Sequence, residues 1–152
     1  MTRNAPEQLS LLDWVPPNPV VRFDPRLIRA NQFTSRLSRA ISVSLDTCGR
    51  SREQIRADMS ELLERPISIN MLNAYASVQR EGHQISVPRF NALISATQDR
   101  RLAEFLVEPF GWAVIERRYL PAIELAAVSE HKKELTRREN ALRRQAMRGG
   151  SW

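Results

Sequence analysis

Residues 51–75, SREQIRADMSELLERPISINMLNAY, decide the fold of this chain. They begin with a capping box, in which the Ser51 hydroxyl accepts from the Gln54 amide and the Gln54 side chain reaches back to the first residue. Apolar residues then recur on one helical face: Ile55, Met59, Leu62 and Leu63. Pro66 ends this segment, because the residue before a proline disfavours helical backbone. The pattern predicts a short helix.

A second short helix follows in the same stretch. Ser68 is its expected N-cap, and the helix is predicted over residues 69–78. Leu72, Tyr75 and Ala76 fall on the side expected to face a core. The positions expected to face outward are Ile69, Asn70, Asn73, Ala74 and Ser77. The stretch therefore predicts two helices, the second with a partly polar outer face.

Three more helices are expected around this pair. Helical spacing of apolar residues runs from about Pro25 to Cys48 and stops at a glycine. Beyond the polar loop at residues 80–84, Ser86 with Pro88 opens a helix, and a fifth helix is expected over about residues 99–110. The sequence thus predicts an all-α fold, with a five-helix domain over residues 26–111.

The order of these elements resembles the phage-repressor-like helix-turn-helix family. The resemblance rests on residues 51–59, 67–75, 81–82 and 86–90 and covers about residues 35–110. Arg56 stands where that family has a small residue, and the link at residues 61–66 is longer than its usual tight turn. The whole chain is also similar to uncharacterised accessory proteins of Mu-like transposable phages, through SLLDWVPP at residues 10–17 and FGWAVIERRYLP at residues 110–121. These resemblances imply a five-helix, repressor-like DNA-binding domain.

Charge is concentrated at the two ends of the chain. The formal net charge is +6, with seven arginines against four acids in residues 1–50, nine against ten in residues 51–128, and seven basic residues against three acids in residues 129–152. Basic ends favour contacts with nucleic-acid phosphates, which supply most non-specific affinity. The near-neutral centre instead favours a protein-interaction module.

If the helix at residues 69–78 enters the major groove, its outward side chains are the candidate base readers. Asparagine can pair with an adenine edge through two hydrogen bonds, and isoleucine or alanine can contact a thymine methyl group. The candidate phosphate contacts are Arg52, Ser68, Arg80, Arg89, Lys132, Lys133, Arg137 and Arg138. The alternative is a solvated helical surface, because acidic residues are interleaved with these arginines.

The first 25 residues are expected to form an extended arm, because Pro16, Pro17, Pro19 and Pro25 interrupt both helix and sheet. Its segment QLSLL, residues 8–12, resembles the peptide with which bacterial proteins dock on the replicative sliding clamp. The docking candidates are Gln8, Leu9, Leu11, Leu12 and Trp14. In the alternative, these apolar residues pack on the protein's own core or dimer interface.

Residues 112–152 are expected to form a short connector and a long charged helix. Residues 112–115 fit either a small strand or a helical turn. A helix is predicted from Pro121 to about Arg148, and self-association into a homodimer is expected through residues 112–128. A heptad phase through Val128, Leu135 and Leu142 makes a coiled coil an open alternative.

Little in the sequence indicates catalysis. The two histidines, His83 and His131, lack companions at metal-ligand spacing, and Cys48 is the single cysteine, so neither a metal nor a cofactor is expected. No signal-peptide core or long apolar run is present, which favours a cytoplasmic protein of a bacterial host without a membrane partner. The expected function is a phage or prophage DNA-binding regulator of transcription, replication or transposition. A host-binding interaction module is the alternative, and a virion component is a more remote one.

Overall fold

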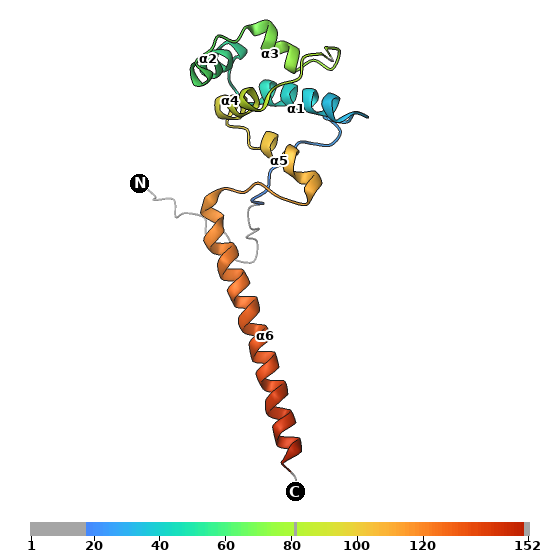
Figure 1. Ribbon diagram of the computed structural model, residues 1–152, viewed down its shortest axis with the longest axis vertical. Coiled ribbons are helices and arrows are strands. Elements are labelled where there is room, and N and C mark those ends of the chain that lie inside the picture. Colours follow the sequence, from blue (N-terminus) through green and yellow to red (C-terminus); the bar gives the residue numbers. More distant parts are fainter. Residues whose placement is uncertain (1–17, 81, 151–152) are drawn as a thin grey trace, which may run out of the picture. The chain divides into compact units, whose positions relative to one another are not determined.

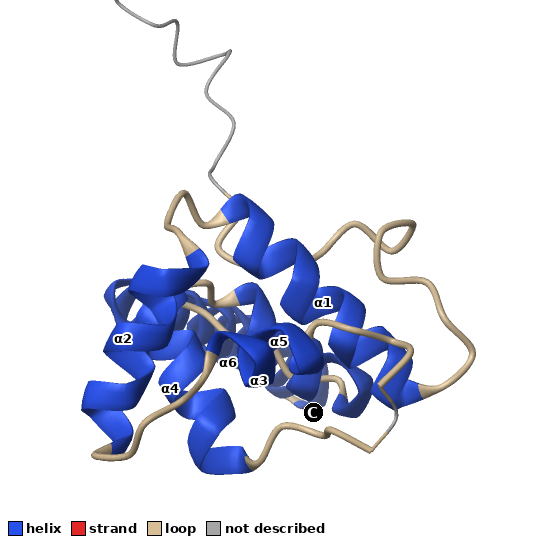
Figure 2. Ribbon diagram, turned by 90° about the horizontal axis from the view of Figure 1, so that it is seen from above, coloured by secondary structure: helices blue, strands red, loops and turns tan. Residues whose placement is uncertain are grey.

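The computed structural model describes residues 18–80 and 82–150, and this part of the chain is all-helical, without strands (Figures 1 and 2). It contains six α-helices, of which the last is long. The chain divides into two compact units, residues 1–114 and 115–152. The first unit holds helices α1 to α5, and the second holds α6.

Helix α1 spans Phe33–Thr47 and buries Ala40, Ile41 and Leu45. The expectation that this helix begins near Pro25 is wrong. Asp24 instead forms a turn, because its carboxylate accepts from the backbone amide of Arg26 at 2.9 Å and its carbonyl accepts from the amide of Leu27 at 2.9 Å. Proline and aspartate at these positions favour a turn over a helix start.

Helices α2 (Arg52–Leu63) and α4 (Val87–Thr97) pack extensively against each other. The predicted capping box is present, with the Ser51 hydroxyl accepting from the amide of Gln54 at 3.2 Å and the Gln54 side chain accepting from the amide of Ser51 at 3.0 Å. Helix α2 ends at Glu64, whose backbone is left-handed with φ 52°. The sequence therefore identified the start of α2 correctly.

Helix α3 spans Ile69–Tyr75 and lies against both α1 and α2. Ser68 caps it as predicted, accepting from the amide of Met71 at 3.1 Å. The helix ends three residues earlier than expected, because residues 76–79 turn away from the helix axis. A hydrogen bond from the amide of Ser77 to the carbonyl of Ala74, 3.2 Å long, marks this turn.

The core of the first unit is made by apolar side chains from all five of its helices. Its most enclosed members are Ile41, Ile55, Met59, Leu72, Leu93 and Leu102. Burying a side chain of this size stabilises the folded state by roughly 1.5–3 kcal/mol. Phe23, which precedes α1, is also buried in this core. The segment before the first helix is thereby anchored to the domain.

Helix α5 spans Arg101–Val107 and continues into a 3₁₀ turn, η1, at Glu108–Phe110. Gly111 follows with φ 77°, a left-handed conformation that suits glycine. Residues 112–116 are neither strand nor helix, so neither form considered for residues 112–115 occurs. A second 3₁₀ turn, η2, spans Arg117–Tyr119.

Helix α6 spans Leu120–Gly149, and none of its described residues is buried within the chain. Pro121 occupies its first turn, as the sequence predicted. Ion pairs one turn apart support the helix: Lys133–Glu130 at 2.7 Å, Arg137–Glu134 at 3.7 Å and Arg143–Glu139 at 2.8 Å. Among the described residues, no helix has both the length and the apolar character needed to cross a bilayer.

Candidate nucleic-acid interface

The connection between α2 and α3 is fixed by hydrogen bonds from α2. The Ser60 hydroxyl accepts from the backbone amide of Ile67 at 2.9 Å and donates to the carbonyl of Arg56 at 2.8 Å. The Arg56 guanidinium donates to the carbonyl of Ile67 at 3.2 Å. Arg56 therefore supports the longer link that follows α2. In the repressor-like pattern that the sequence resembles, residue 56 is small and this link is short. Here the large Arg56 side chain and the long link contact each other.

The candidate base readers do not all lie on one exposed face of α3. Asn70 is exposed, and Ile69, Asn73 and Ser77 are partly exposed. Ala74 is 1% exposed, so the expectation that it faces outward is wrong. Because α3 lies against both α1 and α2, its buried side is wider than a single helical stripe. Ala74 is therefore a core residue.

Asn73 is held in place by an arginine from α2. The Arg52 guanidinium donates one hydrogen bond to Oδ1 of Asn73, 2.6 Å long, and another to a carboxylate oxygen of Asp46, 2.9 Å long. Arg52 and Asn73 are 21 residues apart in sequence. The ion pair with Asp46 offsets part of the local positive potential and, together with the Asn73 bond, orients the guanidinium.

Asn70 is held in a similar way from the other end of α3. The Arg80 guanidinium donates to Oδ1 of Asn70 at 2.9 Å. Arg89, at the start of α4, donates to the hydroxyl of Tyr75 at 2.6 Å. No described acidic side chain forms an ion pair with Arg80 or Arg89. Both arginines therefore hydrogen-bond neutral groups and retain their full positive charge.

The two arginine–asparagine pairs leave the asparagines able to bind a further partner. An amide oxygen can accept two hydrogen bonds, and the amide nitrogen keeps two donors. The side chain can thus still present the acceptor and donor that an adenine edge requires. Each arginine has further N–H groups available for a phosphate oxygen. Sequence reasoning named all four residues but missed their pairing, because it depends on the tertiary placement of α3.

Helix α6 carries the second group of candidates, of which Lys133 and Arg137 share one side of the helix and Lys132 and Arg138 do not. Lys133 and Arg137 are ion-paired with glutamates, whereas Lys132 and Arg138 have no ion pair with any described residue. A basic stripe at spacings of four and seven residues comprises Lys133, Arg137, Arg144 and Arg148. An apolar stripe at spacings of three and seven comprises Leu125, Val128, Leu135 and Leu142, all exposed. At about 100° per residue, the two stripes lie on opposite sides of the helix.

A buried glutamate joins three segments of the first unit, and the sequence analysis missed it. Glu104 in α5 is 1% exposed. Its carboxylate accepts from the backbone amide of Val114 at 2.6 Å and from the Arg22 side chain at 3.4 Å. The sequence does carry a sign of this role, because Glu104 is a charged residue on an otherwise apolar helical face. Glu104 thus ties residues 22 and 114 to α5, and its role is structural.

Asp99 and Arg101 form a second junction beside α1. Burial raises the pKa of the Asp99 carboxyl, but the hydrogen bonds and the charge of Arg101 outweigh it and hold this pKa below its ordinary value. Arg101 pairs with Asp99 at 2.8 Å and donates to the hydroxyl of Thr47 at 2.7 Å. Its guanidinium also lies 4.6 Å from the ring centre of Phe23. The junction secures the segment before α1.

The remaining sequence candidates are placed as follows. Gln8, Leu9, Leu11, Leu12 and Trp14 lie outside the residues that the structure describes. In the part that is described, no three His, Cys, Asp or Glu side chains gather as a metal site would require. No protein-family model, curated protein or solved structure matches this chain.

Proposed function

We propose that this protein binds double-stranded DNA as a regulator, with α2 and α3 acting as a helix-turn-helix and α3 entering the major groove. The observation that carries the proposal is the pair of asparagines on α3, each oriented by an arginine from outside the helix. Asparagine side chains that are fixed before binding lose less conformational entropy in the complex. The preferred bases are adenines, because asparagine pairs with an adenine edge.

The arginines supply the phosphate contacts in this proposal. Arg80 and Arg89 hydrogen-bond neutral groups, and Arg52 is held between Asn73 and Asp46. Phosphate contacts fix the position of a protein on the duplex without specifying sequence. Ser68, exposed before α3, is a further candidate for the backbone. Base reading then belongs to Asn70 and Asn73, with Ile69 and Ser77 beside them.

Helix α6 has two roles in the proposal. Its basic residues add non-specific attraction to DNA: Lys133 and Arg137 within the basic stripe, and Lys132 and Arg138 outside it. Its apolar stripe, with Leu125 70% exposed, pairs with a second copy of the chain. A two-fold dimer would present two copies of α3 to half-sites about one duplex turn apart. The phage resemblance makes transcription or replication–transposition the regulated process.

The test is a binding selection on duplex DNA with the full chain. Fragments of the source genome and a random pool are incubated with the protein, and recovered duplexes are compared by fluorescence anisotropy across a salt series. We expect an enriched adenine-containing site, bound about 10³-fold or more tightly than random duplex, with affinity falling steeply as salt rises. Equal affinity for every duplex at each salt concentration would contradict base reading by α3. No binding at low salt would overturn the proposed function.

A further inference from the structure

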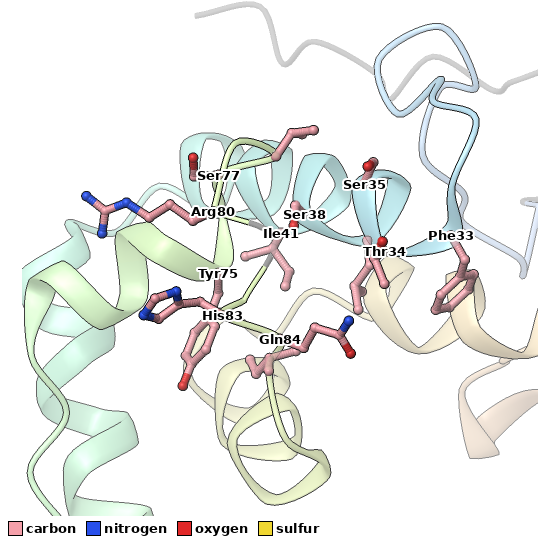
Figure 3. Close-up of a pocket in the computed structure, with 13 residues that line it drawn as sticks. Phe33, Thr34, Ser35, Ser38, Ile41, Tyr75, Ser77, Arg80, His83 and Gln84 are labelled. Carbon is pink, nitrogen blue, oxygen red and sulfur yellow. The ribbon is translucent and has the colours of Figure 1, made fainter.

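A pocket lies between the N-terminal half of α1 and the segment that connects α3 to α4 (Figure 3). Its volume is about 240 Å³. Phe33, Leu37, Ile41 and Tyr75 form its apolar wall. Ile41 and Tyr75 are themselves core residues, with almost no exposed surface. Ile41 and Tyr75 therefore lie beneath the pocket, and of these four side chains Phe33 and Leu37 supply its accessible apolar surface.

The rest of the lining is polar and basic. Hydroxyl groups come from Ser35 and Ser38 on α1 and from Ser77 after α3, and Arg80 and His83 come from the connecting segment. None of the described lining residues is acidic. An apolar wall with a few convergent polar groups is typical of small-molecule sites. Arg80 is the one permanently charged side chain among the described lining residues, and a guanidinium pairs well with an anion.

Arg80 connects this pocket to α3. It lines the pocket and also donates the 2.9 Å hydrogen bond to Asn70. In Figure 3 its guanidinium is turned away from Ile41 and Tyr75. Asn70 is a neutral partner, so a carboxylate offers Arg80 a stronger, charge-assisted hydrogen bond. A negatively charged occupant would therefore draw Arg80 away from Asn70.

We propose that this pocket binds a small carboxylate with one ring or a short hydrocarbon body, and that binding releases Asn70 from Arg80. The body packs on Phe33 and Leu37, and the carboxylate pairs with Arg80. The volume is below the roughly 300–1,000 Å³ of sites for drug-sized molecules, which limits the occupant to about one ring. The consequence for DNA rests on the proposed function: the occupied state loses a phosphate contact and an oriented asparagine, and binds DNA more weakly.

The binding step is tested without DNA, by two-dimensional ¹H–¹⁵N NMR of the full chain. Phenylacetate is the probe, and phenylacetamide is its neutral match. We expect phenylacetate to shift the amides of Ser38, Ser77 and Ile85 and the side-chain amide of Asn70, with a Kd of about 1 mM, as a ligand of this size allows. Phenylacetamide should bind at least about tenfold more weakly.

Two variants make the binding test specific. Arg80→Gln removes the charge from an exposed side chain and should raise the Kd for phenylacetate by about tenfold. Arg39→Gln removes an equally exposed charge from α1 outside the lining and should leave the Kd unchanged. Equal binding of phenylacetate and phenylacetamide, or equal Kd values for the two variants, would overturn the carboxylate site. Shifts confined to residues outside the pocket would overturn it as well.

The coupling step is then measured on the selected duplex. Saturating phenylacetate should weaken DNA binding by about five- to twentyfold in the natural protein, and saturating DNA should raise the Kd for phenylacetate by the same factor, because linkage is reciprocal. An unchanged DNA affinity with phenylacetate bound would overturn the coupling. If phenylacetate binds and no duplex does, the proposed function fails while the carboxylate site stands.

Discussion

The guanidinium of Arg52, in the first turn of α2, donates a 2.6 Å hydrogen bond to Oδ1 of Asn73 in α3. This bond crosses from one helix to the next and orients a side chain that would otherwise rotate freely. A side chain ordered before binding contributes more of its contact energy to affinity. In the proposed function, the Arg52–Asn73 pair would therefore support a preference for particular bases.

Replacing Arg52 with glutamine should reduce both the affinity for DNA and the preference for the selected duplex over random duplex. The variant loses a phosphate contact and the orientation of Asn73, so we expect a loss of about 1–3 kcal/mol on the selected duplex and a smaller loss on random duplex. Arg39→Gln, which removes an exposed arginine of α1 that has no described ion pair, is the control. Fluorescence anisotropy measures both affinities. Equal losses on the two duplexes would show that Arg52 contacts only phosphates.

Removing charge from α6 should weaken binding to every sequence alike. We expect the combined change of Lys132, Lys133, Arg137 and Arg138 to glutamine to lower affinity for selected and random duplexes by the same factor. The slope of log K against log salt should fall by up to about 3.6, since each phosphate contact contributes about 0.9. Arg29→Gln together with Arg39→Gln is the control. An unchanged salt slope would remove α6 from the DNA contact.

Self-association should depend on the apolar stripe of α6. Leu125→Asp and Leu135→Asp each place a charge in this stripe, and an interface core does not tolerate an unpaired charge. We expect both variants to be monomers in light scattering at tens of micromolar, where the natural protein is a dimer. Ala126→Asp puts the same charge on the basic side of the helix and should remain dimeric. A monomeric natural protein at this concentration would refute the dimer.

Asp99 should make the stability of the protein sensitive to acid. Its pKa is lowered in the folded state, so it stabilises the fold above the unfolded pKa of about 3.9, and this contribution is lost as pH falls through the folded pKa. Asp99→Asn should cost about 1–3 kcal/mol of unfolding free energy at pH 7. Urea unfolding at a series of pH values measures the difference between the two proteins.

The pH dependence separates this role of Asp99 from simple packing. If the ionised carboxylate stabilises the fold, the difference in unfolding free energy between the natural protein and Asp99→Asn should narrow steadily as pH falls from about 5 towards 2. Asp46→Asn, which alters an exposed carboxylate, is the control and should show a smaller gap. A gap for Asp99→Asn that is constant over this range would assign the effect to shape rather than charge.

Much of the helical framework was predictable because its signals are local. The capping box at Ser51, the cap at Ser68 and Pro121 in the first turn of α6 each act within a few residues. The start of α1 was misplaced, because apolar spacing continued through a segment in which Asp24 and its neighbours form a turn. Local patterns locate helices well only where turn chemistry does not compete with them.

The candidate site was only partly predictable, because its geometry depends on residues far apart in sequence. Asn70 and Asn73 were identified from helical spacing, but their pairing with Arg80 and Arg52 required the tertiary arrangement. Ala74 was misassigned because α3 packs against two helices, which periodicity on one helix does not show. The pocket wall likewise combines α1 with the segment after α3.

If α3 reads DNA sequence through Asn70 and Asn73, the ratio of affinities for two duplexes depends on these two side chains. This ratio is the Kd on a scrambled duplex divided by the Kd on the selected duplex, both measured at one salt concentration. It is measured for the natural protein, for Asn70→Ala and Asn73→Ala, and for Asn91→Ala, which alters an exposed residue of α4 and serves as the control. We expect the ratio to fall by about five- to 150-fold for each α3 variant, which corresponds to about 1–3 kcal/mol, and to be unchanged for Asn91→Ala. An unchanged ratio for Asn70→Ala and Asn73→Ala, with the natural protein still selective, would contradict base reading by α3.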